Sequence, residues 1–249
     1  MRASSGGSAV PPSRRAPGRR KSSANGRVPG RPSRDAQRAS GRGPREGAAI
    51  GPLIAFAAAM ARGRLAPARR ALAAARRAGA GRVAAEETAL MLMLHAGYPA
   101  ALEGARVLLE EWPGRARRRR EGGPADWKMR GERLCARVYG GAYAKLRSNV
   151  ERLHPDLAAW MIEQGYGRVL TRSGLSGPAR ELIAVTVLAA GGWERQLVSH
   201  LLGARRLGAP PGAIRRACRA GARAAGPAAA AAAARAWRAA FGRDSAPRT

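Results

Sequence analysis

The chain has 249 residues and a formal net charge of +30, from 46 basic and 16 acidic side chains. Hydrophobic residues make up 45% of it, but much of that share is alanine, and aromatic residues reach only 4%. Alanine and arginine favour helix, whereas the β-branched and aromatic strand formers are scarce. The composition therefore excludes a typical β protein and predicts an all-α fold.

The positive charge has two interpretations. A strongly basic chain can bind nucleic acid or another anionic surface. Here arginine far outnumbers lysine, and the excess is spread along a chain that is also rich in alanine, glycine and proline, which indicates coding bias. The basic stretches also lack the aromatic side chains on which bases stack. Nucleic-acid binding stays open as an alternative that the composition does not favour.

The two cysteines, Cys135 and Cys218, form no CxxC pair and are too few for a disulfide framework. They predict buried thiols in a reducing compartment. No apolar run reaches the roughly 18 residues of a membrane span, and the N-terminus lacks the apolar core of a secretory signal. We expect a cytoplasmic protein that does not enter the membrane, with no metal and no cofactor.

The chain begins with a segment that cannot bury a core. Residues 1–48 are rich in serine, glycine, proline and arginine, with too few apolar residues to offset the entropy of ordering, which predicts a disordered basic tail. Residues 49–112 have the composition of successive helices. We expect one to start at Pro52 and another at Pro67, because proline suits a first helical turn, and two more over 86–94 and 100–112. Residues 113–125 then form a linker rich in arginine, glycine and proline.

Residues 126–242 are predicted as a second helical domain, followed by a disordered C-terminus over 243–249. Two helices are expected first, over 127–153 and 155–165, and a loop over 167–178 follows them. Proline and glycine mark the ends of four further helices. These are predicted over 179–190, 193–207, 211–225 and 228–241.

A constant offset relates the two halves of the chain. Leu-Ile-Ala at 53–55 recurs at 182–184, a spacing of 182 − 53 = 129 residues, and the same spacing pairs Arg-Arg-Ala-Gly-Ala at 76–80 with Arg-Arg-Leu-Gly-Ala at 205–209. The pattern predicts two related helical repeats, the first of them degenerate. Only the second repeat has titratable residues at one place, since Glu194 and His200 align with Leu65 and Ala71.

Three stretches resemble the carboxymuconolactone decarboxylase family, whose superfamily includes the alkylhydroperoxidase D proteins. They are YGRVLTRSGL at 166–175, RELIAVTVLAA at 180–190 and GWERQLVSHLLGARRLGA at 192–209. The resemblance implies an alkylhydroperoxidase D-like helical fold, a homo-oligomer and a site of glutamate and histidine, which fall on Glu194 and His200. Alkylhydroperoxidase D proteins have cysteines where this chain has Trp193 and Gln196. Thiol peroxidase chemistry needs a thiolate, so we do not expect it here.

The residues themselves indicate which side chains could form a site. His200 can move a proton near neutral pH, although it stands in the mostly apolar stretch LVSHLL. Glu194 is six residues away, a rise of about 9 Å along a helix, so the two side chains cannot touch directly in one regular helix. Arg172 and Arg180 could hold a substrate carboxylate, or could form ordinary ion pairs. His95 aligns with an alanine of the other repeat and is interpreted as a packing residue.

Three functional hypotheses follow. The first is a carboxy-lyase-like enzyme that acts on a small acidic or lactone substrate, with His200 and Glu194 as catalytic residues and Arg172 or Arg180 as the anion clamp. The second is a non-catalytic helical scaffold that binds a partner, which a His200 packed among leucines without a cavity would favour. The third is nucleic-acid binding through the tail and the arginine-rich linker.

Overall fold

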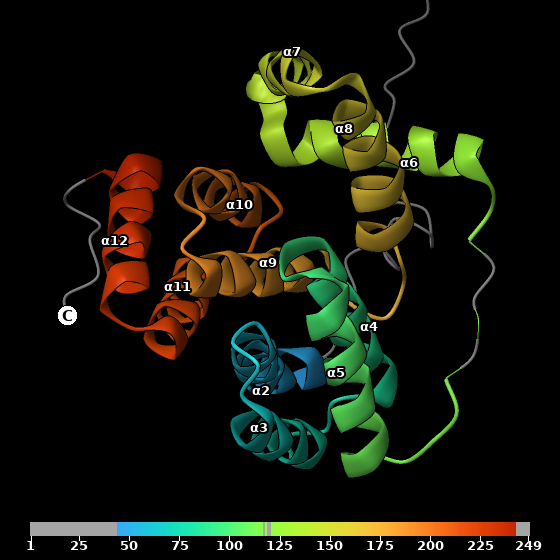
Figure 1. Cartoon of the computed structure of the whole chain (residues 1–249), viewed down its shortest axis with the longest axis vertical. Helices are drawn as coiled ribbons and strands as arrows, with labels where there is room; N and C mark the ends of the chain where they lie inside the picture. Colours follow the sequence, from blue (N-terminus) through green and yellow to red (C-terminus); the bar gives the residue numbers. More distant parts are fainter. Residues whose placement is uncertain (1–43, 117, 119–120, 243–249) are drawn as a thin grey trace, which may run out of the picture. The chain divides into compact units, whose positions relative to one another are not determined.

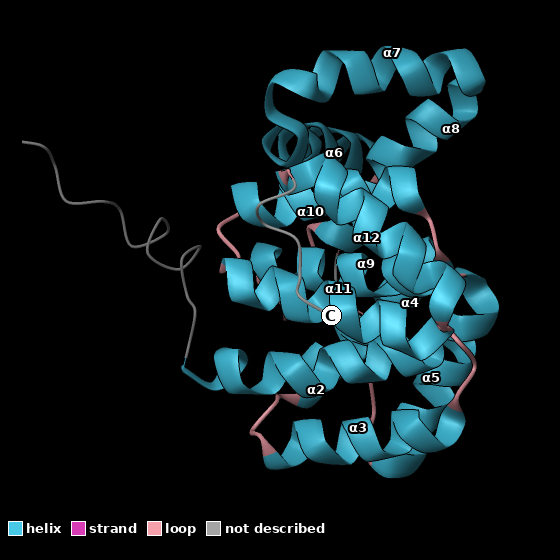
Figure 2. Ribbon diagram, turned by 90° about the vertical axis from the view of Figure 1, so that its left-hand side faces the viewer, coloured by secondary structure: helices cyan, strands magenta, loops and turns pink. Residues whose placement is uncertain are grey.

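The computed structural model describes residues 44–116, 118 and 121–242, which all lie in one unit, Ala39–Thr249. This part of the chain is built from helices and contains no strand, as Figure 2 shows. The all-α fold class is therefore confirmed. None of the helices described has the length and apolar character needed to cross a membrane. The predicted C-terminal tail, most of the predicted N-terminal tail and three linker arginines lie outside the described residues.

The first half of the described chain forms four helices, α2 (Pro44–Met60), α3 (Leu65–Arg77), α4 (Arg82–His95) and α5 (Gly97–Glu111) (Figure 1). Helix α2 begins inside the segment predicted as tail and continues through Pro52, which we expected to start it. Its apolar residues Leu53, Phe56 and Met60 are buried against the neighbouring helices. This packing stabilises a helix that the proline alone would not predict.

The middle of the chain departs most from the predicted boundaries. The single helix expected over 127–153 is broken into α6 (Pro124–Tyr139), the short 3₁₀ turn η1 (Gly140–Ala142) and α7 (Tyr143–Leu153). Gly140 has φ of 56°, a left-handed conformation that ends α6 and suits glycine. The helix expected over 155–165 begins as α8 (Pro155–Trp160) and continues as a π-helical segment, η2 (Met161–Leu170). The predicted loop after it is correspondingly shorter.

The last four helices are α9 (Gly177–Gly191), α10 (Glu194–Arg206), α11 (Pro211–Ala225) and α12 (Pro227–Phe241), close to their predicted spans. Helix α9 is central, with every side chain from Ala179 to Ala190 buried. It contacts α2 and α4 from the first half and α10, α11 and α12 from the second (Figure 1). An almost entirely apolar sequence suits a helix that is surrounded on all sides.

The 129-residue offset also relates helix boundaries. Helix α3 begins at Leu65 and α10 at Glu194, and 194 − 65 = 129. The glycines that end α2 and α9, Gly63 and Gly192, both have positive φ values, of 62° and 71°. The same offset pairs α4 with α11 and α2 with α9. Helix α4 contacts α9, and α11 likewise contacts α2, as expected for two related units packed face to face. The assignment of domains and repeats remains a prediction, and these correspondences agree with it.

Candidate functional site

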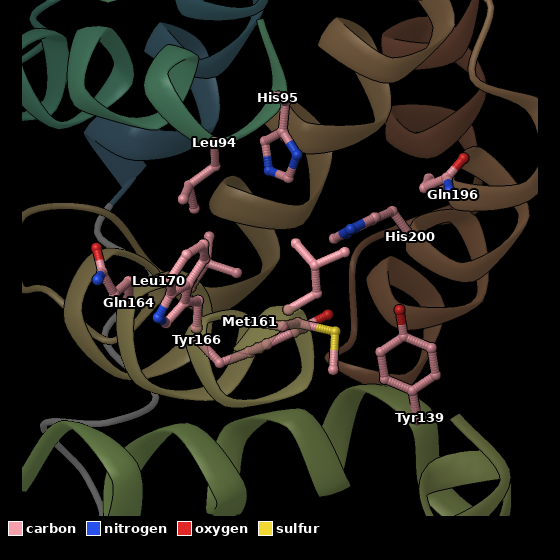
Figure 3. A pocket seen from close by; sticks show the side chains of 12 residues that line it. Leu94, His95, Tyr139, Met161, Gln164, Tyr166, Leu170, Gln196 and His200 are labelled. Carbon is pink, nitrogen blue, oxygen red and sulfur yellow. The ribbon is translucent and has the colours of Figure 1, made fainter. Parts of the chain in front are cut away.

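A cavity of about 390 Å³ lies between α8, η2, α10 and the C-terminal end of α4 (Figure 3). Its size is within the range of small-molecule sites. Apolar side chains form most of its wall, and histidine, tyrosine and glutamine supply the polar groups. The lining residues are Leu94, His95, Tyr139, Leu157, Trp160, Met161, Gln164, Gly165, Tyr166, Leu170, Gln196 and His200.

His200 is the cavity residue with the clearest chemical arrangement. Its Nδ1 atom lies 2.9 Å from Oε2 of Glu181, and both side chains are buried, with exposed fractions of 7% and 2%. A carboxylate accepts hydrogen bonds, so Nδ1 donates and the ring orientation is fixed. Nε2 of His200 makes no hydrogen bond within the described part of the chain. The neutral ring therefore keeps a lone pair at Nε2 beside the cavity.

Helix geometry explains why Glu181 reaches His200. Arg180 and Glu181 are adjacent on α9, so their side chains diverge by about 100° around its axis. Arg180 is directed to Glu87 on α4, whereas Glu181 is directed to α10. Gly203 of α10 leaves the space that the carboxylate occupies, because a Cβ atom there would lie 2.8 Å from Oε2 of Glu181. Gly203, one turn after His200, therefore leaves room for the Glu181 side chain to reach His200.

The second histidine of the cavity, His95, comes from the end of α4. Its ring meets that of His200 edge to face, with centroids 5.3 Å apart. Nε2 of His95 is buried and has no hydrogen-bond partner among the described residues. Burial, with a smaller contribution from His200, lowers the pKa of His95 from 6.5 to about 3. The ring is therefore neutral at physiological pH, and its interpretation as a packing residue misses its place in the cavity wall.

The depressed pKa of His95 predicts a loss of stability in mild acid. The unfolded chain takes up a proton below its ordinary pKa of 6.5, whereas the folded chain does not until about 3, so stability is complete above 6.5 and falls as the pH drops towards 3. Between about pH 7 and pH 5, we expect the free energy of unfolding of wild type to fall by roughly 2 kcal/mol more than that of His95→Phe. Urea denaturation across this range measures the difference, and parallel pH curves for the two proteins would contradict the prediction.

Two tyrosines, Tyr139 and Tyr166, also line the cavity. The rings of Tyr139 and Tyr166 meet edge to face, with their centroids 6.3 Å apart. Burial raises the pKa of both tyrosines, that of Tyr166 strongly. Both hydroxyls therefore stay protonated and offer uncharged polar groups.

The segment that contains Glu181 and His200 also matches a known family. Residues 155–239 match the Carboxymuconolactone decarboxylase family. The resemblance predicted from the sequence is thereby confirmed over this segment, and the helical structure is consistent with the alkylhydroperoxidase D-like fold that it implies. His95 and Tyr139 complete the cavity from outside the matched residues. Comparison with curated proteins gives no match.

The structure does not bring Glu194, the partner that the family resemblance suggested, to His200. Glu194 is in the first turn of α10 and accepts a hydrogen bond of 2.8 Å from Nε of Arg235 on α12. This ion pair is on the surface, with side chains 54% and 38% exposed, so it contributes little to stability. The carboxylate beside the histidine is that of Glu181, which comes from the preceding helix.

Arg172 and Arg180 also lie away from the cavity. Arg172 Nε is 3.0 Å and Arg180 Nη2 is 2.9 Å from Oε2 of Glu87, a carboxylate of α4 that is only 2% exposed. Arg172 forms a further ion pair with Glu121. Both guanidinium groups are therefore engaged in a buried ion cluster that joins α4 to α9 and the loop before it. This position differs from that of the anion clamp predicted for them.

Neither cysteine is suited to thiol peroxidase chemistry. Of the two positions where alkylhydroperoxidase D proteins have cysteine, Trp193 is 57% exposed and Gln196 lines the cavity. Cys135 and Cys218 are both buried and free, and burial raises their pKa values to about 12 and about 11. Such thiols stay protonated and unreactive at neutral pH. Among the described residues, no cluster of three or more metal-binding side chains occurs.

Proposed function

We propose that the chain is an enzyme of the carboxymuconolactone decarboxylase type that transfers a proton to or from a small molecule in the cavity. Nε2 of His200 is the acting group, and Glu181 is the positioning residue that fixes the ring. The observation that carries this proposal is the buried contact of 2.9 Å between Nδ1 of His200 and Glu181 at the wall of a cavity of ligand size. Imidazole is well suited to proton transfer near neutral pH.

The substrate class follows from the family description and is part of the proposal. A small lactone or acid is the substrate to test first, and a carboxy-lyase or a related proton-transfer reaction is the activity. A carboxylate that orients the histidine from behind stabilises the imidazolium formed during the reaction. The exposed Glu194 has no part in this arrangement. Thiol peroxidase activity is not proposed, because both thiols are buried and protonated.

The test is turnover of a panel of lactones and carboxylic acids by wild type, His200→Gln and Glu181→Gln. We expect His200→Gln to lower kcat/KM by roughly a hundredfold or more, because it removes the general acid–base group. Glu181→Gln should lower kcat roughly tenfold or more with little change in KM, because the ring loses its orienting charge while the cavity is preserved. Circular dichroism establishes that each variant is folded.

Glu194→Gln distinguishes the two carboxylates. A surface ion pair with Arg235 predicts turnover within about twofold of wild type for this variant. Equal rates for wild type and His200→Gln, or turnover in neither, would contradict the catalytic proposal. Loss of turnover in Glu194→Gln but not in Glu181→Gln would contradict the assignment of the partner.

A His200 packed among leucines without a cavity would have favoured the non-catalytic scaffold. His200 instead lines a cavity. The nucleic-acid hypothesis depends on the tail and on linker arginines that lie mostly outside the described residues, and no observation favours it. A homo-oligomer and a cytoplasmic location remain predictions from the sequence.

A further inference from the structure

The charge of the cavity wall restricts what can bind there. The wall contains no lysine, arginine, aspartate or glutamate among its described residues. Its polar groups are two tyrosines, two glutamines and two histidines, and the low pKa of His95 keeps one of these histidines neutral. The carboxylate of Glu181 stands directly behind the other, His200. The proton that His200 gains would thus be balanced by Glu181 and would not serve as a counter-ion for a ligand.

The two arginines predicted as an anion clamp are engaged elsewhere. Arg172 and Arg180 hold Glu87 in the buried ion cluster. A carboxylate that entered the cavity would lose part of its hydration against an uncharged wall without gaining an opposite charge, which is unfavourable. The apolar wall, formed by Leu94, Leu157, Trp160, Met161 and Leu170, instead favours the hydrocarbon part of a ligand.

The two histidines identify where the polar end of a ligand would lie. His95 and His200 are close together, with ring centroids 5.3 Å apart, and Figure 3 shows both beside the same cavity. Nε2 of His95 is buried without a hydrogen-bond partner in the described residues, which is costly in an otherwise satisfied protein. The rings are in edge-to-face contact, so no group fits between them. A small hydrogen-bonding group in the cavity would lie beside both rings, where it would meet Nε2 of His200 and, after a turn of the His95 ring, supply the missing partner of His95.

From these observations we infer that the cavity binds an uncharged molecule with an apolar body and a single hydrogen-bonding head, such as a hydroxyl or a carbonyl. The head lies beside the imidazoles of His95 and His200, and His95 is the residue that selects a neutral head over a carboxylate. This inference rests on the proposed function for the role of His200. It narrows that function to proton transfer on neutral lactones and related compounds, because decarboxylation would require a substrate that carries a carboxylate. It gives a binding role to a residue outside the family match.

Calorimetric titration at neutral pH with three probes of matched shape tests the inference. These are p-cresol with a neutral hydroxyl head, p-toluate with a carboxylate head and p-xylene with no polar head. We expect wild type to bind p-cresol roughly tenfold or more tightly than p-toluate, because the anion finds no counter-ion. His95→Phe should weaken p-cresol roughly fivefold, the effect of one lost hydrogen bond, and change p-xylene by less than about twofold.

A second variant covers the case in which His95→Phe fails to fold. His95→Gln retains a polar group and should recover part of the p-cresol affinity. Binding of p-toluate as tight as that of p-cresol, an unchanged p-cresol affinity in His95→Phe, or no p-cresol binding at all would each overturn the inference. These binding results are separate from the turnover tests. A His200-dependent reaction on an anionic substrate would leave the proposed function standing and remove the neutral-ligand inference alone.

Discussion

Replacing Glu87 with glutamine is expected to lower the free energy of unfolding by about 3–5 kcal/mol, the usual cost of removing one partner from a buried ion pair. The glutamine keeps the size of the side chain but removes its charge. Arg180, which is only 2% exposed, then loses a carboxylate that contacts its guanidinium group at 2.9 Å. An arginine cannot give up its proton to relieve the imbalance.

The arrangement around Glu87 explains why the effect should be large. Arg172 donates from Nε to both carboxylate oxygens, at 3.1 and 3.0 Å, while Arg180 donates to one of them. Arg180 also donates to the backbone carbonyls of Arg172 and Ser173, at 2.7 and 3.3 Å. The cluster thus joins α4 to α9 and to the loop that precedes α9. We therefore expect the Glu87 variant to weaken the packing of the first half of the chain against the second.

Urea denaturation followed by circular dichroism measures this effect. Glu103→Gln is the matched control, because Glu103 pairs with Arg106 on the surface at side-chain exposures of 49% and 45% and should cost less than about 1 kcal/mol. The double variant Glu87→Gln/Arg180→Met should be more stable than the sum of its single variants predicts, since it removes the charge that Glu87→Gln leaves behind. Equal stabilities for Glu87→Gln and the surface control would contradict a structural role for the cluster.

The buried carboxylates show which part of the site the sequence could indicate. Glu181 is one charged residue at the start of the apolar run LIAVTVLAA, and Glu87 precedes the similar run TALMLML. A charge within a sequence that is otherwise fully buried is informative, because such residues are buried only when paired. That signal could have identified Glu181. Sequence proximity and the family resemblance directed attention instead to Glu194, on the same helix as His200.

The remaining features depend on contacts between distant segments. His95 and His200 are 105 residues apart, since 200 − 95 = 105, and only the packing of α4 and α10 against α9 brings their rings together. Tyr139 reaches the cavity because α6 packs against η2 and α10. Periodicity and capping residues predicted the helices of the second half closely, since these signals are local. No local pattern specifies which side chains meet across helices.

The same limit explains the failure at Gly165 and Gly167, where the sequence predicted a helix end. These glycines lie within η2, and Gly167 is required by packing instead of by a turn. A Cβ atom on Gly167 would lie 1.8 Å from the carbonyl oxygen of Trp127, and one on Gly131 would lie 2.1 Å from that of Ile162. The two glycines therefore let the backbones of α6 and η2 approach each other directly.

Gly167→Ala is accordingly expected to destabilise the fold by roughly 3 kcal/mol, at the upper end of overpacking effects. The three atoms nearest to the added methyl group all belong to the backbone of Trp127, so no side-chain rotation can relieve the clash. Helix α6 and η2 must separate, and η2 supplies Met161, Gln164, Tyr166 and Leu170 to the cavity wall. We therefore expect weaker binding of p-cresol together with the lower stability measured in urea.

Gly165→Ala provides the control within the same segment. No heavy atom lies within 4 Å of a Cβ atom at Gly165, and alanine is the better helix former. This variant should match wild type or exceed its stability by up to about 1 kcal/mol. A similar loss in both variants would mean that η2 needs flexible glycines along its length. A loss at Gly167 alone would locate the requirement in the contact with Trp127, and would link the shape of the cavity to the close packing of α6 outside the family match.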